Sequence, residues 1–333
     1  LLYLAIVKKF EPLLLLPIAF GMLLSNLPMI KDSSAIMMHT EFFTNPEYMT
    51  DGKYINVGYI CQHGGLLDLL YLGVKLGIYP PLIFVGIGCM TDFGPLIANP
   101  KSILLGAAAQ FGVFFTFVGA LVLSALVPSI NFGIKEAASI GIIGGADGPT
   151  AIYVTKSLAP ALLPAIAVAA YSYMALIPVI QPPIMKLMTR KKDRMIVMEQ
   201  LRPVSKTEKI LFPIIVTIIV ALIIPDAVSL VGCLMLGNLM KESGVVERLT
   251  KMAQNELMNI ITLFLGVTVG ATATASSFLS AQTIGIIVLG LIAFCFSTVG
   301  GLFLGDIMCW VTKGKVNPLI GSAGVSAVPM AAR

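Results

Sequence analysis

Long apolar runs are the feature that most restricts what this chain can fold into. A helix needs about 20 residues to cross the hydrocarbon core of a bilayer. The runs that approach or exceed this length are Pro12–Leu27, Ser102–Val127, Leu163–Met188, Ile210–Ile224, Asn259–Thr274 and Thr283–Val311. They are continuous and lack the alternating pattern of a membrane β-barrel. The sequence therefore predicts an all-α polytopic membrane protein with roughly eight to eleven membrane segments, some of them discontinuous helices.

Composition agrees with this fold class. Of the 333 residues, 57% are hydrophobic and 12% are charged, whereas about a quarter of the residues are charged in an ordinary soluble domain. We expect residues 1–333 to form a single transmembrane domain.

The positions of the charges indicate the topology. Eight basic residues gather in the loop 186–209: Lys186, Arg190, Lys191, Lys192, Arg194, Arg202, Lys206 and Lys209. Lys and Arg are concentrated in loops that stay in the cytoplasm, so we expect this basic loop to be cytoplasmic. A nucleic-acid surface would also be basic, but the loop lacks interleaved aromatic residues and is flanked by membrane segments. The polar stretch 28–65 is expected to be extramembrane.

A helix break is predicted in the sequence GGADGPTAIY, residues 144–153. Gly144 and Gly145 weaken the preceding helix, and Pro149 lacks an N–H and suits the first turn of a following helix. Asp147 or Gly148 then lies near the N-cap of that helix. Backbone groups at such a break have no helical partners and survive in a membrane only inside protein or beside a watery cavity.

Asp147 is the strongest candidate for a functional side chain. Ionisable residues within membrane segments are functional by default, and broken helices commonly hold ions near the middle of the bilayer. A carboxylate, freed carbonyls and the Thr150 hydroxyl would suit Na+, a hard cation. The alternative is an ordinary Asp-Gly-Pro turn in an exposed loop between two spans.

Two further stretches are rich in helix-breaking residues. Residues 316–333 contain Asn317, Gly321, Ser326 and Arg333 together with two prolines, and we expect a second broken helix near 317–329. Its distance from the first break suggests inverted repeats, in which two related halves contribute to one central site. In the stretch 88–101, a loop and a re-entrant segment are equally good interpretations.

Missing motifs argue against several activities, including the use of ATP as an energy source. The chain has no GxxxxGK[ST] loop for ATP and no GxGxxG or GxSxG motif. His39 and His63 lie in the polar stretch without a metal-ligand cluster, and we expect them to be solvated. The five cysteines are scattered and indicate neither a disulfide nor a zinc site.

Four long motifs carry a resemblance to a known family: GIIGGADGPTAIY, AVAAYSYMALIPVIQPPIMK, GNLMKESGVVERL and NPLIGSAGVSAVPMAAR. With them, the chain resembles the membrane beta subunit of the biotin-dependent, sodium-pumping decarboxylases. That family includes the oxaloacetate, malonyl-CoA, methylmalonyl-CoA and glutaconyl-CoA decarboxylases.

The resemblance implies a chemistry, partners and site residues. It implies that the chain, a multi-pass protein of the bacterial cytoplasmic (inner) membrane, decarboxylates carboxybiotin while Na+ is exported and a proton is consumed. The partners would be an alpha (carboxyltransferase) subunit, a biotin carrier domain and a small gamma subunit, with the beta subunit itself forming a homotrimer. The implied catalytic residues are Asp147, Tyr173 and Arg333, and the implied sodium ligands are Asp147, Asn317, Gly321 and Ser326.

Considered without the resemblance, the residues leave alternatives open. Tyr173 could instead be a buried packing residue, and Tyr171 would not share its face of a helix. A sodium-coupled secondary transporter of a small carboxylate would use the same broken helices without a biotin partner. A third alternative is a membrane protein that only anchors a soluble enzyme, but such an anchor does not need a buried carboxylate such as that of Asp147.

Overall fold

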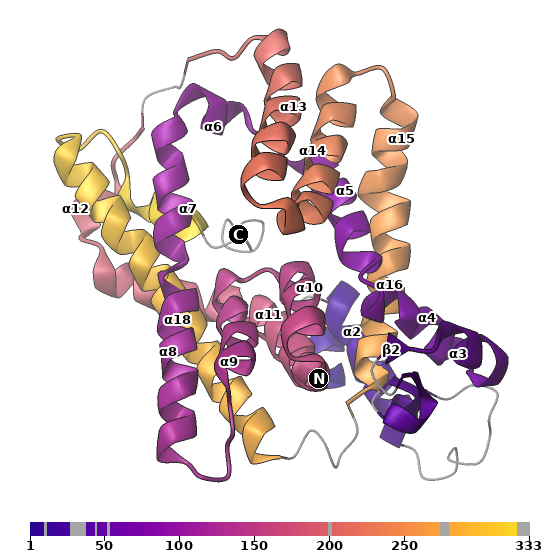
Figure 1. Ribbon diagram of the computed structural model, residues 1–333. Coiled ribbons are helices and arrows are strands. Elements are labelled where there is room, and N and C mark those ends of the chain that lie inside the picture. The colour runs from indigo at the N-terminus through magenta and orange to yellow at the C-terminus, as the bar shows by residue number, and fades with distance from the viewer. Residues whose placement is uncertain are drawn as a thin grey trace.

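The computed structural model describes residues 1–9, 12–26, 38–43, 45–51, 54–198, 202–273 and 280–324. Within this part of the chain the fold is almost entirely helical (Figure 1), which confirms the predicted all-α class. The strands described there are β1 (Met49–Thr50) and β2 (Tyr54–Ile55), which form one antiparallel pair.

The α-helices are α1 (Leu2–Ile6), α2 (Pro12–Asn26), α3 (Val57–His63), α4 (Leu66–Lys75), α5 (Tyr79–Met90), α6 (Gly94–Ala98), α7 (Ile103–Ala109), α8 (Phe111–Leu126), α9 (Ile134–Gly141), α10 (Gly148–Leu158), α11 (Leu163–Met188), α12 (Lys191–Arg194), α13 (Lys206–Ile223), α14 (Val228–Ser243), α15 (Glu247–Met252), α16 (Met258–Ala271) and α18 (Ala281–Val311). Short 3-10 helices join several of them. Two of these short helices matter below, η4 (Ile142–Gly145) and η8 (Pro318–Gly324).

Within the described residues, two helices are long and apolar enough to cross a membrane, Pro100–Leu126 and Ala281–Val311. A third candidate is the pair α4 and α5, which is bent by 69°. Gly77 lies at this bend with a φ of 74°, a conformation that glycine adopts at little steric cost. The count of eight to eleven segments stays a prediction.

The two largest hydrophobic clusters of the buried core both contain residues of α11. One cluster joins α11 to α8, α9 and α18, and the other joins α11 to α2, α4, α5 and α16. Tyr173 belongs to the first cluster and Tyr171 to the second. These two tyrosines therefore lie on different faces of α11, as their two-residue spacing predicts.

The polar stretch and the basic loop lie toward opposite ends of the view in Figure 1. Helix α13, which begins with the last residues of the basic loop, lies at the top, whereas β2 and α3 lie at the lower right. His39 is half-buried, and its Nδ1 lies 2.7 Å from Oδ2 of the fully buried Asp68. The expectation that His39 is solvated is therefore wrong, because the ring fixes the polar stretch to α4.

Candidate functional site

The first interruption separates α9 from α10. The chain leaves α9 through η4 and turns at Ala146, which has the left-handed φ of 54°. A buried alanine in this region is conformationally costly, so the surrounding packing must hold it there. Asp147 then forms the N-cap of α10, and Pro149 lies in its first turn, as the sequence predicts.

Asp147 is held by the helix that it caps. Its Oδ2 accepts a hydrogen bond of 2.6 Å from Thr150 Oγ1, and its Oδ1 accepts one of 3.4 Å from the Thr150 N–H. The side chain is half-buried, and its neighbours Ala146 and Gly148 are buried. This packing differs from that of an exposed Asp-Gly-Pro loop. The carboxylate also lies at the positive end of the α10 dipole.

The opposite side of the interruption is bound to α18. The carbonyl oxygen of Gly144, in η4, accepts a hydrogen bond of 2.6 Å from the hydroxyl of Ser297. Both residues are buried. The hydroxyl supplies a partner from another helix to a carbonyl beside the break, where lipid could supply none.

The two tyrosines of α11 have different environments. Tyr173 donates a short hydrogen bond to the carbonyl oxygen of Ile287, and its ring packs against Phe294 with the ring centroids 5.8 Å apart. Tyr171 is 2% exposed, and its ring lies so close to Gly148 that a Cβ there would overlap it. Among the described residues, the Tyr171 hydroxyl has no hydrogen-bond partner. Tyr171, which the sequence pattern did not single out, is therefore the tyrosine packed beside Asp147.

The second interruption follows α18 and contains η8. Asn317 precedes it, and its amide nitrogen donates to the carbonyl oxygens of Arg194 (3.2 Å) and Ile196 (3.0 Å) in the basic loop. Gly321 lies against Gly301 of α18, where a Cβ on either glycine would overlap the carbonyl oxygen of the other. Ser326 and Arg333 lie outside the described residues.

A buried glutamine of α11 reaches the second interruption. Gln181 is 3% exposed, and its Nε2 donates 3.2 Å to the carbonyl oxygen of Ser322 in η8. Its Oε1 is buried without a hydrogen-bond partner in the described part of the chain. Gln181 is absent from the site residues predicted above, although a glutamine inside an apolar run is a visible signal in the sequence.

Both interruptions pack on neighbouring turns of α18. Ser297 binds η4 and Gly301 contacts η8. These two residues are four positions apart in α18, which corresponds to a rise of about 6 Å along the helix. The structure therefore brings the two interruptions together on one helix. Among the described residues no hydrogen bond joins Asp147 to Asn317: Asp147 accepts from Thr150, and the amide nitrogen of Asn317 donates to the basic loop.

The stretch 88–101 contacts the other end of the basic loop. Oδ1 of Asp92 lies 3.2 Å from Lys209 Nζ and accepts a 2.9 Å hydrogen bond from the Gly94 N–H. The Gly94 N–H, and after it Lys209, hold the pKa of Asp92 below its usual range. The Asp92 side chain is 55% exposed. This geometry favours the loop interpretation over a re-entrant segment.

The first interruption offers oxygen atoms that could hold a cation, and it does not offer a set of metal-binding side chains. Within the described residues, no three His, Cys, Asp or Glu side chains gather as a metal site. The polar groups near Asp147 are hydroxyls and carbonyls, which suit a hard monovalent or divalent cation better than a soft metal.

A polytopic helical membrane protein with a carboxylate at a helix interruption is the class that this fold and site define. The chain belongs to the family of the Na+-transporting oxaloacetate decarboxylase beta subunit, whose match covers residues 1–333. This confirms the resemblance seen in the four motifs. As a member of the family, the chain is a decarboxylase subunit linked to ion translocation.

Individual relatives cover the whole chain. It is 58% identical to the methylmalonyl-CoA decarboxylase subunit beta of Propionigenium modestum, over 100% of this chain and 82% of that protein. It is 55% identical to the glutaconyl-CoA decarboxylase subunit beta of Acidaminococcus fermentans (100% and 80%) and 52% identical to the oxaloacetate decarboxylase beta chain of Klebsiella pneumoniae (100% and 83%). These names share the subunit type and differ in the substrate.

Proposed function

We propose that this chain couples the decarboxylation of carboxybiotin, carried by a partner subunit, to the export of Na+ with consumption of a proton. The observation that carries the proposal is the position of Asp147, which is half-buried at the N-cap of α10 with Thr150 Oγ1 at 2.6 Å. An aspartate in this place, in a family of Na+-transporting subunits, is suited to bind the transported ion.

Na+ would bind between the carboxylate of Asp147 and nearby neutral oxygens. Thr150 Oγ1 already touches the carboxylate, and the carbonyls of η4 lie just before it in the chain. Hard cations prefer such oxygen ligands. We assign Asn317, Gly321 and Ser326 of the second interruption as further sodium ligands. This assignment requires an arrangement in which both interruptions contribute ligands to one ion.

The decarboxylation consumes the proton. The bond between the ring nitrogen and the carboxyl carbon of carboxybiotin breaks, CO2 leaves, and the electron pair stays on the nitrogen, which then takes up a proton. Tyr173 is assigned to proton or sodium handling. Arg333 is assigned to binding the carboxylate of carboxybiotin, because a guanidinium forms paired hydrogen bonds with a carboxylate.

The proposal includes the assembly and its location. The partners are an alpha (carboxyltransferase) subunit, a biotin carrier domain and a small gamma subunit, and the beta subunit forms a homotrimer. The complex lies in the bacterial cytoplasmic (inner) membrane, with the basic loop on the cytoplasmic side, where the carrier arrives.

Replacing Asp147 by Asn tests the sodium site. The variant removes the charge and keeps the shape of the side chain. In liposomes containing the assembled complex, we expect loss of both Na+ transport and Na+-dependent carboxybiotin decarboxylation. The matched control is Asp92→Asn, since Asp92 is an exposed acid that pairs with Lys209 in the stretch 88–101. Normally coupled transport in Asp147→Asn would refute the assignment.

The same preparation separates the proposal from a secondary transporter. A transporter would take up a small carboxylate with Na+ in liposomes that contain this chain alone. A decarboxylase subunit transports Na+ only while carboxybiotin is being consumed. Solute uptake without a biotin partner would therefore replace the proposed function by the transporter.

A further inference from the structure

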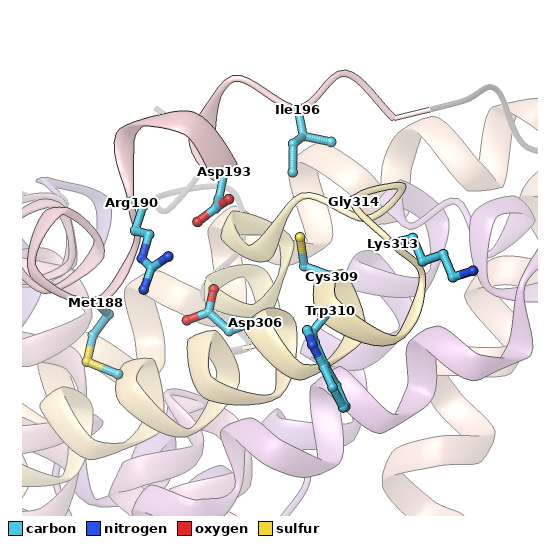
Figure 2. A pocket seen from close by; sticks show the side chains of 9 residues that line it. All are labelled: Met188, Arg190, Asp193, Ile196, Asp306, Cys309, Trp310, Lys313 and Gly314. Carbon is cyan, nitrogen blue, oxygen red and sulfur yellow. The ribbon is translucent and has the colours of Figure 1, made fainter.

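A pocket lies where the C-terminal end of α18 meets the start of the basic loop. Its volume is about 660 Å³, which falls in the range of about 300–1,000 Å³ that is typical of small-molecule sites. Figure 2 shows that Arg190 and Asp193 of the loop and Asp306 of α18 converge on the same space. A loop and a helix therefore bring charged groups of both signs to one pocket.

The charged groups of the pocket are close neighbours that do not pair. Asp193 and Arg190 both act electrostatically on Asp306. Nevertheless, within the described part of the chain, the charged ends of these three residues form no ion pair or side-chain hydrogen bond. Two carboxylates and a guanidinium are therefore available to a ligand that carries both a cation with N–H donors and an anion.

The pocket lies at one end of a membrane-spanning helix. Helix α18 is long and apolar enough to cross a membrane, and Trp310 in its last turn lines the pocket and is 81% exposed. Tryptophan is enriched where membrane helices reach the membrane–water interface. Phe303, Ile307 and Trp310 are all exposed and follow one another at the spacing of one helix face. An exposed apolar face of α18 thus leads from the membrane to the pocket.

The head group of phosphatidylethanolamine carries charges that complement those of the pocket. Its primary ammonium has three N–H donors for the carboxylates of Asp193 and Asp306, and its phosphate can accept paired hydrogen bonds from the Arg190 guanidinium. Phosphatidylcholine has the same phosphate, but its quaternary ammonium has no N–H donor. Phosphatidylglycerol has no cation and would bring a negative charge toward two carboxylates. Of these three lipids, phosphatidylethanolamine alone provides a partner for all three side chains.

The walls of the pocket lead directly to the second interruption. In the loop, the carbonyl oxygens of Arg194 and Ile196 accept hydrogen bonds from Asn317, the residue before η8. At the end of α18, shortly before Asn317, the Gly314 N–H donates a hydrogen bond of 2.8 Å to the Cys309 carbonyl. A ligand that bridges the loop and α18 therefore holds both segments that position η8.

We infer that this pocket binds the head group of a phosphatidylethanolamine molecule of the surrounding membrane, and that the bound lipid stabilises the contact of the loop 190–196 with Asn317. The acyl chains of the lipid lie along Phe303 and Ile307. Soluble phosphoethanolamine has the same charges but no acyl chains, so the exposed apolar face of α18 favours the lipid. The site is separate from the ion site of the proposed function and does not depend on it.

Trp310 supplies a direct measurement of binding, because it is the one tryptophan of the sequence and lines the pocket. Lipids with brominated acyl chains quench tryptophan fluorescence on contact. The full chain is placed in phosphatidylcholine nanodiscs that contain an increasing fraction of brominated phosphatidylethanolamine or brominated phosphatidylcholine. We expect saturable quenching by phosphatidylethanolamine with about tenfold higher affinity, because its ammonium gains hydrogen bonds to charged groups. The Trp310→Phe variant should lose this signal.

Variants then test the polar contacts. Asp193→Asn and Asp306→Asn each remove one charged acceptor of the ammonium, so the preference for phosphatidylethanolamine over phosphatidylcholine should fall from about tenfold to less than about threefold. Arg190→Gln removes the partner of the phosphate and should weaken the binding of phosphatidylethanolamine about tenfold. The matched control is Lys192→Gln, an exposed cation of the same loop that does not line the pocket. It should bind both lipids as the unaltered chain does.

Hydrogen exchange measures the effect on the second interruption. Amides of residues 317–324 should exchange more slowly in nanodiscs that contain phosphatidylethanolamine than in nanodiscs of phosphatidylcholine alone. The Asp306→Asn variant should remove this difference, and Lys192→Gln should keep it. Equal exchange of the unaltered chain in the two kinds of nanodisc would overturn the effect of the lipid on Asn317.

Three results of the fluorescence titration would overturn the lipid site. The first is equal quenching by brominated phosphatidylethanolamine and brominated phosphatidylcholine, or stronger quenching by brominated phosphatidylglycerol. The second is an unchanged lipid preference in both aspartate variants. The third is loss of the quenching when soluble phosphoethanolamine is added, which would show that the pocket recognises the head group without the membrane lipid.

Discussion

The hydrogen bond from Ser297 to η4 leads to a quantitative prediction. The Ser297 hydroxyl donates 2.6 Å to the carbonyl oxygen of Gly144, and both residues are buried. The Ser297→Ala variant removes this donor and leaves the carbonyl without its partner from α18. A buried polar group that loses its partner costs about 1–3 kcal/mol. The free energy of opening the first interruption should fall by this amount.

Hydrogen exchange followed by mass spectrometry measures that opening. Because about 1.4 kcal/mol corresponds to a factor of ten in an equilibrium constant, amides in residues 140–150 should exchange about fivefold to a hundredfold faster in Ser297→Ala. The neighbouring Thr298→Val variant is the matched control. The Thr298 hydroxyl bonds within α18 to the carbonyl of Phe294, which keeps its helical N–H partner.

The control variant should leave exchange in residues 140–150 unchanged. Equal exchange in Ser297→Ala and the unaltered protein would refute the conclusion that α18 holds this interruption closed. Equal acceleration in both variants would show that general loosening of α18, and not the lost donor, is responsible.

Two more perturbations test the contacts of η8 and the basic loop. Gly321→Ala places a Cβ on the Gly301 carbonyl and should cost about 1–3 kcal/mol of stability, which is measured as a lower Tm. The control is Gly106→Ala, which has nothing within 4 Å of its added Cβ and should not lower the Tm. In the basic loop, hydrogen bonding to Arg202 lowers the pKa of Glu208 from 4.5 to about 2. The stabilisation by Glu208 is therefore present above pH 4.5 and is lost as the pH falls toward 2. A spin label at Val204, in a background without the native cysteines, should become mobile as the pH falls over that range. In the Glu208→Gln variant the label should already be mobile at pH 7. An immobile label in Glu208→Gln at pH 7 would contradict the stabilising role of Glu208.

Local sequence determines the first interruption and the helical fold. Gly144, Gly145 and Pro149 disfavour a continuous helix, and Asp147 caps α10 through contacts within four residues of itself. All of these effects act over less than two helical turns. They are therefore visible in the sequence before any tertiary contact is known.

The environments of the site residues depend on contacts that are distant in sequence. Tyr171 and Tyr173 are chemically identical, and only tertiary packing places Tyr171 beside Gly148 of α10 and Tyr173 beside Gly290 of α18. Asn317 binds carbonyls more than 120 residues earlier in the chain. No periodicity or motif encodes such pairings, so Tyr171 and the loop contacts of Asn317 could not be predicted.

The basic loop has a structural role, because it binds two other parts of the chain. Its first half binds Asn317 through the carbonyls of Arg194 and Ile196, and its second half binds the stretch 88–101, where Arg202 donates 3.4 Å to the Ile97 carbonyl and Lys209 pairs with Asp92. The contact with Asn317 uses main-chain carbonyls and is insensitive to salt, whereas the exposed ion pair is screened by it. Raising the salt concentration should therefore release the loop from the stretch 88–101 before it releases η8.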